Sequence, residues 1–388
     1  MLALHFSHTP LVGAPGRVCA ALRALPGVDA RWVVLDAQAG EYDRMSFELD
    51  LRWPRDRDEV LALLSRCDVV HLHNYLHLDS ADFAPVSFAE LWQTGKPMVR
   101  HFHSTPDLVA RFNRQPTQAV ADCPIPKLVI AQYPERQFPD ARLVPNVVAL
   151  DLPSPPDDGP LRIGYAPTRF NSGGSSRWDT KGYGETVKLL RQLRRRCARE
   201  GIALEVDLIE RVPHAECLAR KARCHLFIDD LVTGSYHLNT LEALAQGSVC
   251  LSCLDGRTLA ALQELTGRSD FPVVNVGVEH ALEVLMDLCR QPALTRALGR
   301  QNRAWMLAHW QPARMATHFV DAYRHVIASP RGPFPARRLD DAASRWRAVG
   351  QYDTLWRARQ PHWPRLTPRW MLAPKAAIGR ALRALGLR

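Results

Sequence analysis

Short apolar runs, each followed by a segment long enough to form a helix, recur along the chain from its first residue. Before residue 150 these runs predict strands at 2–7, 31–35, 68–74, 97–104, 127–131 and 142–148. Apolar runs without polar alternation are typical of strands buried on both faces, as in parallel sheets with helical crossovers. The pattern therefore predicts an α/β domain over residues 1–150.

Residues 151–160 read Asp-Leu-Pro-Ser-Pro-Pro-Asp-Asp-Gly-Pro and interrupt this alternation, which predicts an interdomain linker. The alternation then restarts, so we expect a second α/β domain over 161–328 and a separate tail over 329–388. The predicted strands are 161–167, 203–209, 225–229, 249–254 and 272–276. The predicted helices are 183–198, 214–223, 238–246 and 257–266, followed by closing helices at 279–290, 293–308 and 312–327.

The distribution of charge and the cysteine content indicate which partners and which cellular compartment suit the chain. Residues 331–388 hold 13 basic and 3 acidic residues, which is the whole of the chain's formal charge of +10. The body is therefore neutral, and any partner drawn by charge should meet the tail. No apolar run approaches the roughly 20 residues of a membrane span, and the first residues lack a basic leader region, which favours the cytoplasm. Nine cysteines without a leader suggest reduced thiols.

Cys250 and Cys253 have the spacing of a zinc or redox pair but fall inside a predicted buried strand. Residues three apart on a strand point to opposite faces, so we interpret both as core residues.

The strongest functional signal is the stretch 228–247, Ile-Asp-Asp-Leu-Val-Thr-Gly-Ser-Tyr-His-Leu-Asn-Thr-Leu-Glu-Ala-Leu-Ala-Gln-Gly. A strand ends at Asp229, a small-residue loop follows, and a helix is predicted to start near Asn239. The N–H groups of such a helix N-terminus suit a phosphate. Glu242, expected in the first turn, could accept hydrogen bonds from a ribose diol, although it could also merely decorate its helix.

This stretch resembles the donor-site signature of GT-B glycosyltransferases of the large family-4-like group, in which a glycine-rich loop enters a Leu-Glu-Ala helix. The resemblance implies two Rossmann-like doubly wound domains facing across a cleft, and it implies that Glu242 binds the nucleotide ribose. The sequence departs from the pattern where Gly234 replaces a glutamate that contacts the donor sugar and where His237 replaces a glycine. The expected donor-site residues of this stretch are Gly234, Ser235, Tyr236, Asn239, Thr240 and Glu242.

A second match lies just after the linker. Lys181 and Gly182 correspond to the family's Arg…Lys-Gly element, whose cations neutralise the donor diphosphate, and the arginine is Arg177 or Arg169. Fixed cations stabilise a departing nucleoside diphosphate without a metal. We therefore expect neither a metal nor a separate cofactor.

The first domain supplies weaker signals. Gly13 and Gly16 follow the first predicted strand, where the family's glycine loop approaches phosphate and acceptor, although an ordinary turn also needs glycines. The pairs His71/His73 and His101/His103 end two strands, and each pair shares one strand face. No acidic residue or cysteine completes a familiar zinc spacing, so we expect no metal.

By the resemblance, His103 is the catalytic residue that faces the donor sugar, with His101 as its rival. Residues 143–148 also resemble the family's Val-Pro-Asn-Gly-Val element. The implied reaction is transfer of a sugar from a nucleotide-sugar donor to a hydroxyl acceptor, in cell-surface polysaccharide or glycolipid synthesis, with retention of configuration. The alternatives are a nucleotide-sugar 2-epimerase of the same fold and a non-catalytic nucleotide-binding or sugar-binding subunit.

The tail combines its basic residues with four of the chain's ten tryptophans, and its last segment is amphipathic. This composition favours attachment to an anionic membrane surface, where a lipid-linked acceptor would be met. A disordered or self-packed basic tail is the alternative. A single basic tail on a neutral body is a poor footprint for nucleic acid, so we expect no nucleic-acid partner.

Overall fold

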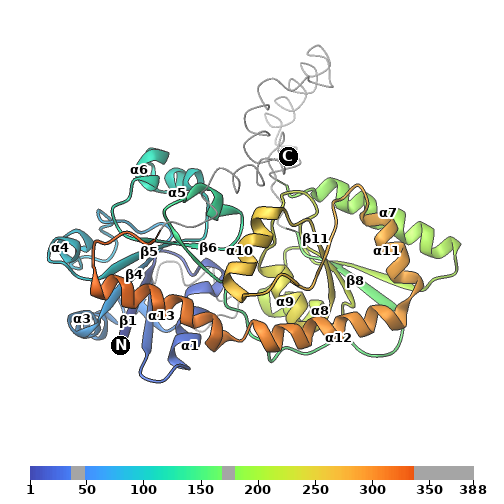
Figure 1. The fold of residues 1–388 in the computed structure, drawn as a ribbon, viewed down its shortest axis with the longest axis horizontal. Coiled ribbons are helices and arrows are strands. Elements are labelled where there is room, and N and C mark those ends of the chain that lie inside the picture. The colour runs from blue at the N-terminus through green and yellow to red at the C-terminus, as the bar shows by residue number, and fades with distance from the viewer. Residues whose placement is uncertain (36–48, 168–179, 336–388) are drawn as a thin grey trace, which may run out of the picture.

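The computed structural model describes residues 1–35, 49–167 and 180–335, which form two α/β domains lying side by side (Figure 1). Each domain is built on one sheet whose strand pairings are all parallel. The predicted α/β class with two Rossmann-like domains is therefore confirmed.

The first sheet has the strand order β3-β2-β1-β4-β5-β6-β7. Its central strands carry apolar side chains on both faces, because Val33 joins one buried cluster while Trp32 and Val34 join the other. The short strand β3 is not among the predicted strands, since its three residues include Arg52. The strands are β1 (Leu2–Ser7), β2 (Asp29–Leu35), β3 (Leu51–Trp53), β4 (Val69–His73), β5 (Met98–Phe102), β6 (Lys127–Ile130) and β7 (Arg142–Val144).

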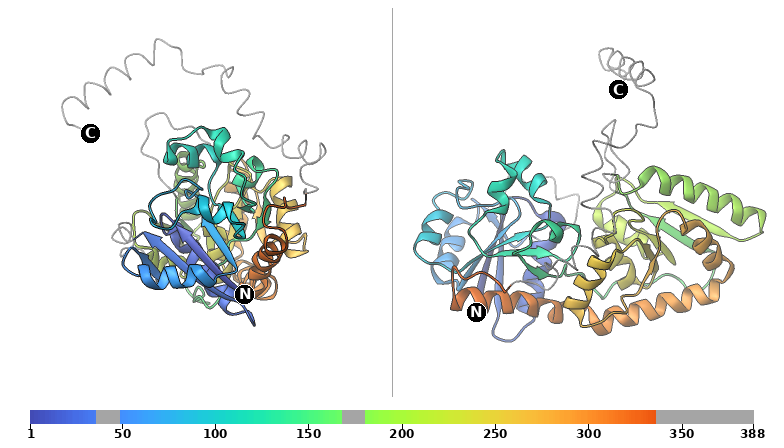
Figure 2. Two further views of the ribbon diagram at one scale, coloured as in Figure 1. Left: turned by 90° about the vertical axis from the view of Figure 1, so that its left-hand side faces the viewer. Right: turned by 45° about the horizontal axis from the view of Figure 1, so that its top comes forward.

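Helices cover the two faces of this sheet (Figures 1 and 2). They are α1 (Ala14–Arg23), α3 (Arg57–Arg66), α4 (Phe88–Gln93), α5 (Pro106–Asn113) and α6 (Thr117–Ala121), with 3-10 turns η1 (Leu11–Gly13) and η3 (Tyr133–Gln137). The turn η1 carries the chain from β1 into α1 with Gly13 at a φ of 73°, a left-handed conformation that glycine adopts without strain. This turn lies at the carboxyl end of the central strand.

The second sheet has the order β12-β11-β10-β8-β9. Its strands are β8 (Leu161–Tyr165), β9 (Leu204–Leu208), β10 (Leu226–Ile228), β11 (Val249–Ser252) and β12 (Val273–Asn275). Its helices are α7 (Tyr183–Arg199), α8 (His214–Lys221), α9 (Leu238–Gln246), α10 (Gly256–Thr266), α11 (Ala281–Arg290) and α12 (Pro292–His309). Cys250 is buried within β11, as predicted, whereas Cys253 follows the end of that strand and is half-buried.

The proline-rich segment has no helix or strand and runs along α12. Three arginines of that helix hold it. Arg303 donates to the Leu152 carbonyl at 2.6 Å, Arg296 donates to the carbonyl of Gly159, and Arg300 pairs with an aspartate of the segment. The predicted linker is therefore fixed to the second domain along its length.

The last helix, α13 (Pro312–Ala328), returns from the second domain to the first and packs on α1 and on the strands β4, β5 and β7 (Figure 1). Fully buried Tyr323 on this helix donates or accepts hydrogen bonds with His71 and His5 of the first sheet. One apolar cluster consequently runs from the first sheet through α13 into the second domain.

The described chain continues past α13 to residue 335 and still packs on the first domain. Arg331 donates to the Trp92 carbonyl at 3.1 Å, and Phe334 is buried. The start of the predicted tail therefore belongs to the folded body, while 336–388 lies outside the described residues. Within the described residues, no helix has both the length and the apolar character needed to cross a membrane.

Candidate functional site

The N-terminus of α9 follows β10 at the carboxyl edge of the second sheet, as the sequence predicts. A buried carboxylate occupies this helix end. Asp229 accepts hydrogen bonds from the His237 backbone N–H at 2.7 Å and from the Thr240 hydroxyl at 2.6 Å. Burial raises the pKa of Asp229, but His237, Thr240 and Lys181 outweigh burial and hold the pKa well below its usual range. The expectation that the N–H groups of this helix end are free for phosphate is therefore wrong for the N–H of His237.

The loop between β10 and α9 is shaped by its own side chains. Asp230, fully buried, accepts hydrogen bonds from the backbone N–H groups of Val232 and Thr233, each at 2.9 Å. Ser235 and Tyr236 are also fully buried, and the Tyr236 ring packs in the core. Both side chains are therefore enclosed by the protein, and their predicted place beside a donor stays a prediction. The aromatic ring of this loop is therefore part of the hydrophobic core.

Gly234 lies where the two domains meet. Its carbonyl accepts hydrogen bonds from Arg136 of the first domain at 3.1 Å and from the Thr258 hydroxyl at 2.8 Å. Its φ is 78°, and a Cβ at this position would lie 2.8 Å from a carboxylate oxygen of Asp255, which itself forms a buried ion pair with Arg136. The backbone therefore requires glycine where the family pattern has glutamate.

Glu242 lies on α9 and is 5% exposed, although the sequence pattern predicts the buried stripe on its neighbours Leu241 and Ala245. Because α9 begins at Leu238, Glu242 is in the second turn rather than the first. Its carboxylate pairs with the buried Lys221 ammonium at 2.5 Å and with His214 at 3.2 Å.

Two opposing effects set the charge of this carboxylate. Burial raises the pKa of Glu242, but Lys221, His214 and Arg17 of the first domain together lower it to about 2. Glu242 is therefore ionised at neutral pH and already has two partners. A ribose would have to share the carboxylate with Lys221 and His214.

Asn239 and Lys181 link this site to the segment that follows a second strand, β8. Asn239 donates to the Ala166 carbonyl at 2.9 Å, just after β8, and accepts from Lys221 at 2.5 Å. Lys181 precedes α7 with a positive φ, and Gly182 beside it packs so closely on Val232 that a Cβ would lie 2.5 Å from that side chain. Lys181 therefore lies beside the β10–α9 loop. Arg169 and Arg177 lie outside the described residues.

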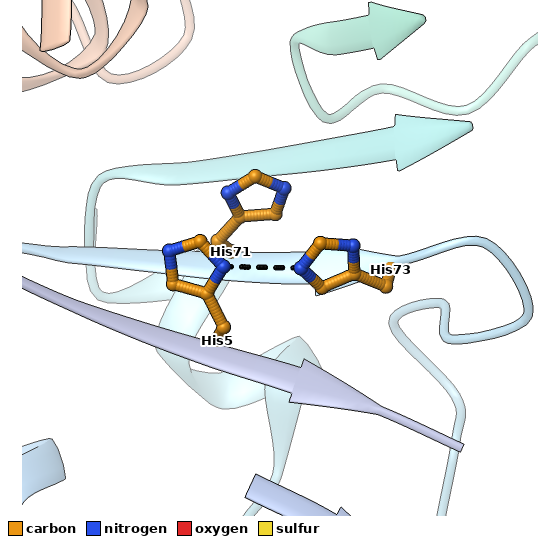
Figure 3. Close-up of side chains that lie close together, drawn as sticks. All are labelled: His5, His71 and His73. Carbon is orange, nitrogen blue, oxygen red and sulfur yellow. Dashed lines mark hydrogen bonds between the residues drawn. The ribbon is translucent and has the colours of Figure 1, made fainter. Parts of the chain in front are cut away.

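Five histidines gather at the carboxyl edge of the first sheet, and four of them are the two pairs seen in the sequence. His5 on β1 joins His71 and His73 on β4 and His101 and His103 at the end of β5. Figure 3 shows His5 and His73 joined by a hydrogen bond, at 3.0 Å between Nδ1 and Nε2.

A hydrogen-bonded chain runs through this cluster. His73 Nδ1 lies 3.1 Å from His103 Nε2, and His5 Nε2 lies 3.1 Å from the Tyr323 hydroxyl, which in turn lies 2.7 Å from His71 Nδ1. The chain therefore connects α13 to His103. The two ring nitrogens of His101 and Nε2 of His71 have no hydrogen-bond partner among the described residues.

Burial keeps these imidazoles neutral. It is the main cause that lowers the pKa of His5 and of His103 to about 3, with a further contribution from Arg23 and Arg17 respectively. The pKa values of His71, His73 and His101 are also well below their usual range, because burial and the neighbouring histidines disfavour a charge. His103, the predicted catalytic residue, is half-buried and one residue beyond β5.

Gly13 and Gly16 border a surface hollow of about 590 Å³, which Arg17 also lines. Arg17 donates to the carbonyls of Val147 and Val12, at 3.1 and 2.8 Å. Its charge lowers the pKa of His103 and also that of Glu242, so it lies near both. Arg17 thus lies near the carboxyl edges of both sheets.

Several of these residues are not among those predicted from the sequence. Arg17 directly follows the glycine loop, and His5 is a polar residue inside an otherwise apolar strand. The position of each in the sequence could therefore have indicated a functional residue. Lys221 and His214 lie on a separate helix, α8, and nothing in their local sequence indicates a pairing with Glu242.

No protein-family model matches the chain, and no curated protein sequence matches it at a significant level. Solved structures do match. The Anabaena protein HepE in complex with UDP-glucose has 12% identity and a TM-score of 0.51, over 84% of this chain and 100% of that chain. Sucrose-phosphate synthase from Thermosynechococcus elongatus has 12% identity and a TM-score of 0.50, over 85% and 100%.

An alpha-glucosyltransferase in complex with UDP and a 13-mer DNA has 12% identity and a TM-score of 0.51, over 84% of this chain and 100% of that chain. Identities this low establish the fold and nothing finer. The chain has the two-domain GT-B fold.

Proposed function

We propose that this protein is a glycosyltransferase of the family-4-like group, which transfers a sugar from a nucleotide-sugar donor to a hydroxyl acceptor. The observation that carries the proposal is the placement of four groups at the carboxyl edges of the two sheets. Glu242 and Lys181 lie at the second sheet, neutral His103 lies at the first, and Arg17 is close to both Glu242 and His103. The GT-B fold of the structures that match supports this assignment.

The charges suit a donor with a diphosphate leaving group. As the bond between the anomeric carbon and the phosphate oxygen breaks, negative charge grows on the diphosphate, and fixed cations stabilise it. Lys181, beside the β10–α9 loop, and Arg17, on α1, are the described cations placed for this role. In the same proposal Glu242 accepts from the ribose, in competition with Lys221 and His214.

His103 has a role that a neutral imidazole can perform. Its pKa of about 3 excludes a proton-donating imidazolium at neutral pH. Its Nε2 is bonded to His73, and its Nδ1 has no hydrogen-bond partner among the described residues, so it is available to a sugar hydroxyl. We assign it the orientation of the sugar as positive charge develops at the anomeric carbon. With retention, the acceptor proton passes to the leaving phosphate oxygen.

The proposal also covers the acceptor and where the enzyme meets it. The hollow beside Gly13 and Gly16 is a place for a hydroxyl acceptor, including a lipid-linked one. The basic residues and tryptophans of 331–388 would hold the enzyme, on the cytoplasmic side, to an anionic membrane surface. Because 331–335 pack on the first domain, the test is a deletion of 336–388. It should abolish sedimentation with anionic vesicles and leave nucleotide binding intact; full-length protein that ignores such vesicles at low salt would refute the membrane role.

A thermal-shift screen of nucleoside diphosphates and nucleotide sugars tests the donor site, because a ligand that binds only the native state stabilises it. A hit is then incubated with and without hydroxyl acceptors, and the products are analysed. Transfer to an acceptor supports the proposal. Epimerised donor without acceptor would instead identify a 2-epimerase, and binding without any turnover would identify a non-catalytic subunit.

A further inference from the structure

The histidine cluster of the first sheet holds more nitrogen atoms than its hydrogen bonds use. His101 is 1% exposed, yet neither of its ring nitrogens has a partner among the described residues, and Nε2 of His71 is also unpartnered. A buried polar group without a partner costs about 1–3 kcal/mol, so such groups in native proteins usually meet a ligand, an ion or water. A neutral imidazole has one N–H and one lone pair, so His101 presents a free lone pair inside the cluster, which a ligand that accepts nitrogen lone pairs would satisfy.

The spacing of three of these side chains fits a metal ion. One nitrogen each of His73, His101 and His103 lie within 4.8 Å of one another, and the pair His73 Nδ1 and His103 Nε2 is 3.1 Å apart. Two nitrogens bound to one tetrahedral zinc at about 2.0 Å are about 3.3 Å apart. Small side-chain rotations would therefore bring all three nitrogens onto one ion.

We propose that His73, His101 and His103 form a three-histidine site for a transition-metal dication of the zinc class. Neutral imidazoles are the ligands that zinc, copper and nickel prefer over magnesium or calcium. Three protein ligands leave a fourth position open. The proposal replaces the sequence-based expectation of no metal, and it does not depend on the proposed glycosyl transfer.

The hydrogen bonds of His73, one of the three ligands, have the arrangement that a bound metal requires. A histidine that binds metal through one ring nitrogen normally donates its other N–H to a neighbour. With Nδ1 of His73 on the metal, its Nε2–H donates to His5 Nδ1 at 3.0 Å. His5 Nε2–H then donates to the Tyr323 hydroxyl, which donates to His71 Nδ1. One direction of donation therefore gives His73, His5 and Tyr323 each an acceptor, from the metal ligand to α13.

The neighbouring trio His5, His71 and His73 is the less suitable choice. All three are fully buried, whereas His103 is half-buried and gives the site access to solvent. The described cluster contains no carboxylate or thiolate, and Arg17 adds a positive charge near His103. We therefore expect an anion, such as hydroxide or a phosphate oxygen, in the fourth position.

The experiment uses the full-length, untagged chain, stripped with a chelator and titrated with Zn²⁺ in a calorimeter and with Co²⁺ in a spectrophotometer. The expected result is one equivalent of metal and the intense visible bands of tetrahedral Co²⁺. His101→Ala should weaken binding by more than about 100-fold. Because His101 makes no hydrogen bond in the metal-free structure, this variant should stay folded, which circular dichroism checks. The control, His280→Ala, removes an exposed histidine outside the cluster and should bind as the wild type does.

X-ray absorption of the zinc-loaded wild type gives a readout that needs no variant. Three imidazole nitrogens at about 2.0 Å support the site. A shell containing sulfur would assign the metal to the chain's cysteines and overturn the proposal. Failure to bind one equivalent, or equal binding by wild type and a folded His101→Ala, would also overturn it.

Discussion

Both sheets are parallel, but their carboxyl edges are opposite in chemistry. The first gathers five neutral histidines, four of which are joined with Tyr323 in a hydrogen-bonded chain, and the second holds the buried ion pair between Lys221 and Glu242. In the first, burial lowers each pKa until the charge is lost. In the second, a partner of opposite charge outweighs burial, so the charge is kept.

This difference shows that burial alone does not decide the charge of a polar sheet edge. The partner available to each group decides it. The neutral edge is sensitive to acid, because protonation of any imidazole introduces an unpaired charge. The paired edge is sensitive to substitution, because removal of one partner leaves the other charge unpaired.

The largest expected effect is on stability at low pH, where the two sheet edges should respond differently. Unfolded histidines bind protons below about pH 6.5, whereas folded His5 and His103 have pKa values of about 3. Between these limits the unfolded state takes up more protons, so stability falls as the pH falls; above 6.5 the histidines contribute no pH dependence. The pKa values of the other buried histidines are lowered in the same direction, so they add to this loss. Denaturant unfolding with a chelator present measures it.

Glu242 gives the contrast in the same experiment. Its pKa is lowered to about 2, so its contribution is present above about 4.5 and is lost only as the pH falls toward 2. Hydrogen exchange between pH 6 and 5 should therefore show destabilisation centred on the first sheet. His101→Asn should reduce the pH slope, because it removes one buried neutral imidazole. An unchanged slope in His101→Asn would contradict the buried neutral state.

Removing one member of the buried pair should have the next largest effect. Lys221→Ala leaves Glu242 buried with only His214 as its partner, and we expect a loss of about 3–5 kcal/mol in unfolding free energy. The double variant Lys221→Met with Glu242→Leu should recover most of this loss, since apolar residues of similar volume remove both charges. If the single variant is as stable as the wild type, the pair is not buried as described.

Lys181 tests whether the charged edge is the donor side. Lys181→Met should weaken binding of the nucleoside diphosphate found by the screen by about 1.5–3 kcal/mol, the contribution of a hydrogen bond to a charged group. Calorimetry measures the affinity, and Lys188→Met, on the following helix, is the control. Unchanged affinity in both Lys181→Met and Glu242→Ala would place the donor elsewhere.

Gly234 should give the smallest effect of the four. Gly234→Ala introduces a Cβ at a φ of 78°, within 2.8 Å of Asp255, and we expect destabilisation of about 1–3 kcal/mol. Gly267→Ala, at a φ of 70° with nothing within 4 Å of the added Cβ, isolates the cost of the backbone conformation. If the two variants lose equal stability, the contact with Asp255 does not matter.

Much of the fold could be predicted because its signals are local. Continuous apolar runs indicated both parallel sheets, and the proline-rich segment marked the domain boundary, which the structure places against α12. The strand β3 could not be predicted, because three residues around Arg52 carry no pattern. Its place is given by pairing with β2, which is a tertiary contact.

The site was less predictable because its charges have partners from distant parts of the chain. The helix with Glu242 was predicted, but Lys221 comes from another helix, and only the folded chain shows the carboxylate as an ion pair. Tyr236 is predicted beside the donor, whereas the structure buries its ring in the core. Aromatic residues occur both in cores and in ligand sites, so the residue type alone does not decide between them. The paired histidines could be predicted to share strand faces, whereas their meeting with His5 depends on strand order.

The return of α13 to the first domain has a mechanical consequence. The polypeptide crosses between the domains twice, once at the linker and once between α12 and α13, where fully buried Trp310 donates to the Asn146 carbonyl at 3.0 Å. Two covalent crossings therefore tie the domains together, so separating the domains would strain both connections at once and would also break the contact of Trp310. Small-angle scattering with and without nucleotide would measure whether the distance between the domains changes.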